Sequence, residues 1–187
     1  MSGRFEMMAT PLAGVTKLAR RRLADSRGYL ERLYCADELK LVLGARQIAQ
    51  INRTLTVRKG TVRGLHFQYP PHAETKIVTC LTGAVFDVAV DLRAGSPTYL
   101  HWHGELLSAD SGAALVIPEG CAHGFQTLGP DCEMLYLHTT SYAPAAEGGL
   151  NAEDPAIGIH WPEPITELSE RDRALPNVAN GFKGLSP

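Results

Sequence analysis

The sequence contains no apolar run that approaches the roughly 20 residues of a membrane span. Its first residues include Arg4 and Glu6 and lack a continuous apolar stretch followed by a small-residue cleavage site, so secretion is not indicated. A CxxC pair is also missing. The four cysteines are spread among apolar positions, which favours buried reduced thiols over a disulfide framework or a zinc site. We therefore expect a soluble, cytoplasmic protein with no membrane partner.

A strong excess of one charge sign is absent as well. Lys and Arg number 18 and Asp and Glu number 20, so no global field favours nucleic acid as a partner. The one basic run, residues 17–22, is interpreted as a solvated surface segment and not as a phosphate- or membrane-binding patch. Nothing in the 187 residues requires two cores. The prediction is one domain over residues 1–187, with its core at about 24–176.

From residue 47 onward the sequence has the pattern of a β protein. Short runs of β-branched and aromatic residues are separated by Gly/Pro turns, and helical periods are few. Thr82-Gly83 is a hairpin signal, and Ser169 followed by acidic residues is typical of a capped short helix. The predicted fold class is all-β, a sandwich or barrel of the jelly-roll type with short peripheral helices. Such a fold can enclose a ligand between its sheets.

Several polar residues lie inside strand-like runs where apolar residues are usual. A single buried His or Tyr is more often a satisfied core residue than a catalytic one. Five in one small domain are harder to explain in this way, because each unpaired buried polar group costs about 1–3 kcal/mol. The five are Arg63, His66, Lys76, His123 and Tyr136.

The segment TVRGLHFQ, residues 61–68, holds two of these residues. Strict alternation would place Arg63 and His66 on opposite faces of a regular strand. Gly64 lies between them, and glycine inside a strand usually marks a bulge or kink. We therefore expect a local break in the pleat that turns both side chains towards one pocket.

Two kinds of site are less well supported by the sequence. His101 and His103 share a strand face and Glu105 follows, and jelly-roll proteins often carry a metal site. The same run is equally typical of an edge strand at a subunit contact. Cys121 precedes His123 by two residues, yet it fits a core position better than a nucleophile. We expect no metal and no cofactor.

Proton transfer next to a carbonyl fits the residue types best. Histidine can supply a base whose pKa lies near neutrality, and tyrosine can supply the acid. A cation such as Lys76 can stabilise an enolate. Either Asp172 or Asp87 could orient the base, and a phosphorylated substrate would explain Arg63.

With these residues assembled, the chain resembles the dTDP-4-dehydrorhamnose 3,5-epimerase family, which consists of cofactor-independent sugar-nucleotide epimerases on a cupin jelly roll. The resemblance covers about residues 24–176. It rests on five motifs in the family order, which are VRGLHFQ (62–68), EXKXVXCXXGXVFDVAVDLRXGSPT (74–98), IPEGCAHGFQTL (117–128), LYLHTTSYAPXXEGG (135–149) and IXWPXXXXELSXRD (159–172).

The resemblance implies a nucleotide-linked 4-keto-6-deoxy sugar as substrate and inversion at carbon 3, carbon 5 or both, through an enolate. It also implies a homodimer, because Arg27 resembles the family arginine that reaches the diphosphate from the neighbouring subunit. The implied catalytic residues are His66 as base, Asp172 as its partner, Tyr136 as acid and Lys76 at the enolate oxygen. The implied substrate-binding residues are Arg63, Arg27, His123, Gln50, Asn52, Glu31 and Gln68.

Two alternatives remain at this point. One is a cupin that binds a sugar nucleotide without turning it over, and the other is a metal-dependent cupin that uses His101, His103 and Glu105. The pair of Tyr136 and Asp172 favours the epimerase, because a binding module has little need for both.

Overall fold

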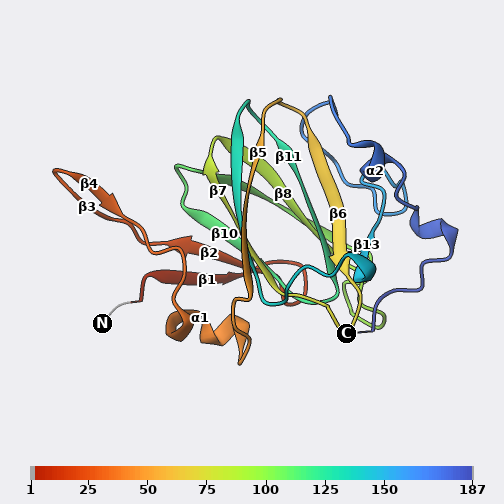
Figure 1. The fold of residues 1–187 in the computed structure, drawn as a ribbon, viewed down its shortest axis with the longest axis horizontal. Helices are drawn as coiled ribbons and strands as arrows, with labels where there is room; N and C mark the ends of the chain where they lie inside the picture. Colours follow the sequence, from red (N-terminus) through yellow and green to blue (C-terminus); the bar gives the residue numbers. More distant parts are fainter. Residues whose placement is uncertain (1–2, 187) are drawn as a thin grey trace.

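The computed structural model describes residues 3–186 and consists mainly of two packed antiparallel sheets (Figure 1). In sheet order, the six-stranded sheet contains β1 (Phe5–Ala9), β2 (Thr16–Arg20), β10 (Ala113–Ile117), β7 (Lys76–Thr82), β12 (Cys132–His138) and β5 (Gln50–Thr56). The five-stranded sheet contains β13 (Glu147–Gly149), β6 (Val62–Gln68), β11 (Cys121–Thr127), β8 (Ala84–Asp91) and β9 (Trp102–Ser108). This arrangement confirms the predicted all-β sandwich.

The remaining elements are short and peripheral. The ribbon β3 (Leu23–Asp25) and β4 (Gly28–Leu30) extends from the body as a separate two-stranded hairpin (Figure 1). The helices are α1 (Ala36–Leu43), α2 (Glu170–Arg173) and the 3-10 turns η1 (Pro144–Ala146) and η2 (Val178–Asn180). The serine signal for a short helix is confirmed, since the Ser169 side chain accepts a hydrogen bond from the Asp172 backbone N–H at the start of α2.

Alternation along the strands divides the core into three layers. Val78 and Cys80 of β7 face the space between the sheets, whereas Ile77 faces outward and packs under α1 with Leu39 and Leu43. On the other sheet, the chain after β13 covers the outer face, where Leu150 and other apolar side chains pack on β8 and β11. The chain after β13 thus covers the outer face of the five-stranded sheet, and α1 covers part of the outer face of the six-stranded sheet.

Strand β8 shows how this layering positions a charge. Val85 and Ala89 face the interior, and Val88 and Val90 face the outer layer. Asp87 lies between the two inward residues in the alternation and is fully buried. Val88 and Val90 of β8 therefore support the outer layer, while the other face of this strand carries the Asp87 carboxylate into the interior.

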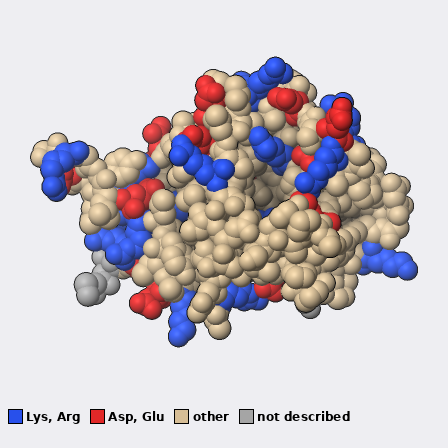
Figure 2. Space-filling view, viewed as in Figure 1, with Lys and Arg blue, Asp and Glu red and all other residues tan. Residues whose placement is uncertain are grey.

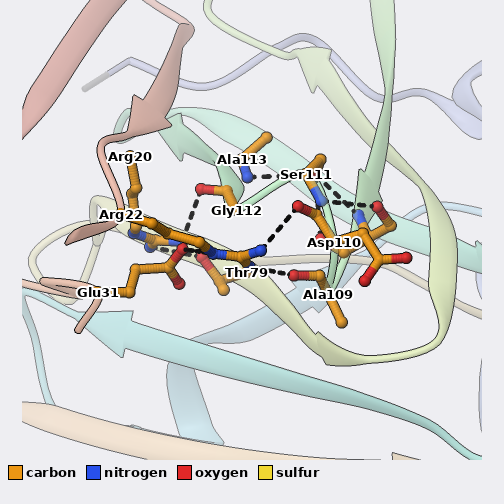
Figure 3. A network of polar contacts seen from close by, with 10 residues as sticks. Arg20, Arg22, Glu31, Thr79, Ala109, Asp110, Ser111, Gly112 and Ala113 are labelled. Carbon is orange, nitrogen blue, oxygen red and sulfur yellow. Dashed lines mark hydrogen bonds and ion pairs between the residues drawn. The ribbon is translucent and has the colours of Figure 1, made fainter. Parts of the chain in front are cut away.

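Two local predictions were wrong. The chain does not form a hairpin at Thr82-Gly83, because β7 and β8 belong to different sheets. Gly83 has φ +78°, and a Cβ there would lie 2.8 Å from the Cys132 Sγ atom, so the glycine serves a crossing between the sheets. The basic run is not entirely solvated either, since Arg20 is buried on β2 and donates to the Thr79 hydroxyl and the Gly112 carbonyl (Figure 3).

Within residues 3–186, no helix combines the length and the apolar character needed to cross a membrane.

Candidate active site

A cavity of about 790 Å³ opens between the two sheets at the end where β5, β6, β7, β11 and β12 meet. On the face shown in Figure 2, basic and acidic side chains surround a hollow in the surface. Eight of the eleven residues that the sequence assigned to the site line this cavity. Seven are on strands and Asp172 comes from α2; the seven are Asn52, Arg63, His66, Gln68, Lys76, His123 and Tyr136.

His66 and Asp172 form the closest pair in the cavity. The His66 Nε2 atom lies 2.7 Å from Asp172 Oδ1, although the two residues are 106 positions apart in the sequence. The second carboxylate oxygen of Asp172 accepts from the Gly64 backbone N–H at 3.3 Å. Asp172 is the buried partner and His66 the half-buried one, so the imidazole retains a free edge towards the cavity.

The electrostatics of this pair favour an ionised carboxylate. Burial raises the pKa of Asp172, but the hydrogen bond and positive charge of His66 more than offset this effect, so the pKa is lowered overall. An ionised Asp172 accepts a hydrogen bond from the N–H group at Nε2. In that tautomer of His66 the free lone pair is on Nδ1. Of the two aspartates considered from the sequence, Asp172 is therefore the one that orients His66.

The predicted break at Gly64 is present. On β11, His123 pairs with His66 and Phe125 with Arg63, so β6 carries one more residue than its partner over this stretch. Gly64 has φ +128°, and a Cβ there would lie 2.6 Å from the Gly124 Cα atom. The bulge brings Arg63 and His66, three positions apart, to the same cavity.

Tyr136 faces the cavity from the opposite sheet. It is carried by β12, whereas His66 is carried by β6. The phenol lies 3.4 Å from the Thr54 hydroxyl. Burial, together with the nearby negative charge of Asp87, raises the pKa of Tyr136, so this side chain holds its proton throughout the neutral range.

A second histidine–aspartate pair lies deeper in the site. His123 Nε2 is 2.8 Å from Asp87 Oδ1, and both side chains are almost fully buried. The His123 ring packs edge-on against Tyr136 at 5.9 Å between centroids. Asp87 thus holds His123 and contributes to the field at Tyr136.

Lys76 is accompanied by two residues that the sequence reasoning did not assign to the site. The Lys76 Nζ atom lies 3.1 Å from Glu74 Oε1, and Glu74 Oε2 lies 2.8 Å from His138 Nδ1. All three side chains line the cavity. Alternation was the available signal, because Glu74 shares a strand face with Lys76, and His138 shares one with Tyr136.

The predicted substrate-binding residues divide into two groups. Arg63 is held by Thr56 Oγ1 at 2.9 Å and by the Leu55 carbonyl at 3.2 Å, which leaves guanidinium donors available to an anion. Asn52 and Gln68 also line the cavity, and Gln50 bonds Asn52 at its rim.

The other group lies outside the cavity of its own chain. Arg27 is at the tip of the β3–β4 hairpin, where it pairs with Asp25 in solvent. Glu31 binds Arg22 Nε at 2.7 Å, and Arg22 also donates to the carbonyls of Ala109 and Asp110 (Figure 3). This network anchors the base of the hairpin to the turn between β9 and β10, and neither Arg27 nor Glu31 lines the cavity of its own chain.

The proposed metal ligands lie elsewhere. His103 and Glu105 are on β9, the edge strand of the five-stranded sheet, and Glu105 also pairs with Lys17 at 2.9 Å. In the part of the chain that the structure describes, no group of three or more His, Cys, Asp or Glu side chains is arranged to hold a metal ion. Burial raises the pKa of the Cys121 thiol to about 12, which suits a core residue and not a nucleophile.

Comparison with known proteins gives a consistent result. The family described as dTDP-4-dehydrorhamnose 3,5-epimerase matches residues 9–180. A dTDP-4-dehydrorhamnose 3,5-epimerase of Sinorhizobium fredii is 43% identical over 168 residues, which cover 89% of this chain and 86% of the relative. A dTDP-4-dehydrorhamnose 3-epimerase of Streptomyces niveus is 40% identical over 163 residues, with 87% and 78% covered.

The fold comparison agrees with the sequence comparison. The crystal structure of NovW, a 4-keto-6-deoxy sugar epimerase of Streptomyces spheroides, superposes with a TM-score of 0.91 at 34% identity and covers 100% of this chain and 95% of NovW. The match extends over both sheets and therefore over both walls of the cavity. The chain belongs to the dTDP-4-dehydrorhamnose 3,5-epimerase family of sugar-nucleotide isomerases.

Proposed function

We propose that the protein epimerises a dTDP-linked 4-keto-6-deoxy sugar, with His66 as general base and Tyr136 as general acid. The observation that carries the proposal is the origin of these two groups in opposite sheets, with the cavity between them. Inversion at a carbon requires that a proton leave one face of the ring and return to the other. Two proton-transfer groups on facing walls meet that requirement, whereas a single group does not.

The chemistry depends on the ketone at carbon 4, which acidifies the hydrogens on carbons 3 and 5. His66 Nδ1 takes the proton, the C–H electron pair forms a carbon–carbon double bond, and the carbonyl π pair moves to the oxygen. The ammonium of Lys76 stabilises the resulting enolate oxygen, and Asp172 stabilises the imidazolium. Tyr136 then delivers its proton to the opposite face of the carbon, where the carbon–carbon π pair forms the new C–H bond and the oxygen pair re-forms the carbonyl. Net transfer of one proton from the imidazolium to the tyrosinate through solvent restores both groups.

The diphosphate is assigned to Arg63, whose guanidinium faces the cavity with donors to spare. Arg27 is assigned to the cavity of a neighbouring subunit. Its exposed position on a hairpin that extends from the body supports a homodimer in which each hairpin reaches the other copy. Gln50 and Asn52 at the rim are assigned to the nucleotide base, with Gln68 and His123 as further contacts and Glu31 as part of the hairpin's contribution.

The remaining proposals concern organisation. We assign residues 1–187 to a single domain without a cofactor or metal. A cytoplasmic location is supported by the free thiols of Cys80, Cys121 and Cys132, which are compatible with a reducing compartment.

The test is deuterium uptake. The enzyme is incubated in heavy water with dTDP-, CDP- and GDP-linked 4-keto-6-deoxy sugars, and exchange at carbons 3 and 5 is followed by NMR. We expect uptake with the dTDP sugar. Uptake at both carbons identifies a 3,5-epimerase, and uptake at carbon 3 alone identifies a 3-epimerase. Absence of uptake at either carbon, with the dTDP sugar bound, would instead support a binding module.

A further inference from the structure

The carboxylate of Glu74 is shared between two cavity-lining side chains. Its Oε1 atom lies 3.1 Å from the Lys76 ammonium, and its Oε2 atom lies 2.8 Å from His138 Nδ1. The exposed fractions of the side chains are 8% for Glu74, 8% for Lys76 and 13% for His138. The three groups are therefore removed from bulk water, where an ion pair of this kind would contribute little.

The sheet itself assembles the three residues. His138 is directly opposite Lys76 in the pairing of β12 with β7, and Glu74 precedes Lys76 on the same face. The His138 ring also stacks on Tyr136, with centroids 6.0 Å apart and planes 17° apart. The group thus connects the proposed electrophile to the proposed acid along one wall of the cavity.

The ammonium of Lys76 has few other partners. Its next contact is the His66 carbonyl at 3.5 Å, which is the limit of a hydrogen bond. A buried ammonium needs a counter-charge, and Glu74 provides it. Burial raises the pKa of Glu74, but the hydrogen bond from His138 and the charge of Lys76 outweigh it and lower the pKa, so the carboxylate is ionised.

His138 acts on the carboxylate from the other side. A donor on Nδ1 fixes the rotation of the Glu74 carboxylate and so the direction of the oxygen that faces Lys76. The other ring nitrogen, Nε2, is buried and has no hydrogen-bond partner among the described residues. The contact with Glu74 is thus the one hydrogen bond that orients this ring in the part of the chain that the structure describes.

We propose that Glu74 and His138 are positioning residues that hold the Lys76 ammonium in place to receive the enolate oxygen, and that both act on the reaction through Lys76. This inference rests on the proposed role of Lys76. It assigns function to two side chains that do not themselves meet the reacting atoms.

A double-mutant cycle tests the coupling. We expect Glu74→Gln to lower kcat about tenfold, with KM changed less than about twofold, because the charge that positions Lys76 is lost. In a Lys76→Met background the same substitution should have almost no effect. Glu133→Gln is the matched control, because Glu133 lies on β12 outside the cavity and pairs with Arg53. Equal effects of Glu74→Gln with and without Lys76 would overturn the proposal.

Rescue by a conservative variant tests His138. Leucine removes the donor to Glu74, whereas the side-chain amide of asparagine can replace the Nδ1 donor. We expect His138→Leu to lower kcat about tenfold and His138→Asn to recover most of that loss. Equal losses in both variants would mean that ring packing matters and the donor does not, which contradicts the proposal.

A measurement without substrate separates this inference from the proposed function. Reductive methylation of Lys76, followed by peptide mass spectrometry, reports how firmly its amine is held. We expect Glu74→Gln to accelerate methylation of Lys76 several-fold and Glu133→Gln to leave it unchanged. An unchanged rate in Glu74→Gln would refute the positioning role, even if the deuterium experiment succeeds. If no substrate is turned over, the proposed function fails while this measurement still decides the role of Glu74.

Discussion

Replacement of Asp172 by asparagine tests the His66–Asp172 pair most directly. The carboxylate lies 2.7 Å from Nε2 and leaves Nδ1 as the proposed base. An amide of the same shape can instead donate its NH₂ group to Nε2, which moves the imidazole proton to Nδ1 and removes the basic lone pair. The change therefore acts on the tautomer of His66 as well as on its charge.

The size of the effect follows from the contact that is lost. A hydrogen bond between charged groups contributes about 1.5–3 kcal/mol, and about 2.7 kcal/mol corresponds to a 100-fold change in rate. We expect Asp172→Asn to lower kcat/KM by at least about 100-fold, mostly through kcat. Initial rates of deuterium uptake, combined with steady-state kinetics, measure this loss.

A matched control separates catalysis from folding. Asp154 is also a buried aspartate, and its carboxylate accepts from the backbone N–H groups of Ala156 and Val178, away from the cavity. Asp154→Asn should reduce the melting temperature and leave kcat unchanged. If folded Asp172→Asn retains more than about a third of the wild-type kcat/KM, the orienting role of Asp172 is refuted.

Three further predictions follow from other contacts. Tyr136→Phe should lower kcat about 100-fold at unchanged KM, since the proposed acid is lost but the ring remains. Because burial raises the pKa of Tyr136, a pH–rate profile of the wild type should show no loss of activity from tyrosine ionisation up to about pH 10. Gly64→Ala should destabilise the fold by about 3 kcal/mol in urea unfolding and reduce activity, since the new Cβ would lie 2.6 Å from the Gly124 Cα atom and the backbone has φ +128°. Full activity and stability in this variant would show that the bulge does not require glycine. Burial raises the pKa of Asp91, but hydrogen bonds from Arg93 and neighbouring hydroxyls outweigh burial and lower the pKa from 3.8 to about 2. The contribution of Asp91 to stability, about 2 kcal/mol, is therefore present above pH 4 and lost as the pH falls towards 2. The difference in unfolding free energy between wild type and Asp91→Asn should fall to about half at pH 3, and a constant difference would exclude this linkage.

The sequence predicted those features that depend on neighbours along the chain. Alternation placed Tyr136 and His138 on one strand face, and the glycine in VRGLHFQ predicted the bulge that joins Arg63 to His66. The short helix at Ser169 followed from its capping pattern. These signals act over a few residues, and the physics behind them is local.

The features that sequence alone did not predict depend on distant parts of the chain. The glycine signal at Thr82-Gly83 is the same for a hairpin as for a crossing between sheets, so the sheet assignment of β7 and β8 had to come from the structure. The prediction that Arg20 is solvated was wrong because its hydrogen-bond partner, Thr79, belongs to a strand that is distant in the sequence. For Asp172 and His66, 106 residues apart, the family resemblance was the signal that paired them.

Because His66 lies on one sheet and Tyr136 on the other, the width of the sandwich sets the distance between the proposed base and the proposed acid. The width is set by apolar side chains packed between the sheets, such as Leu107 and Met134, neither of which lines the cavity. Replacing either one by a smaller residue would leave a cavity in the core, and a shift of the sheets towards each other would shorten the distance between His66 and Tyr136. Core positions outside the cavity are therefore expected to influence the turnover rate. To change which carbon is inverted, substitutions at these core positions can be combined with substitutions of the residues that line the cavity.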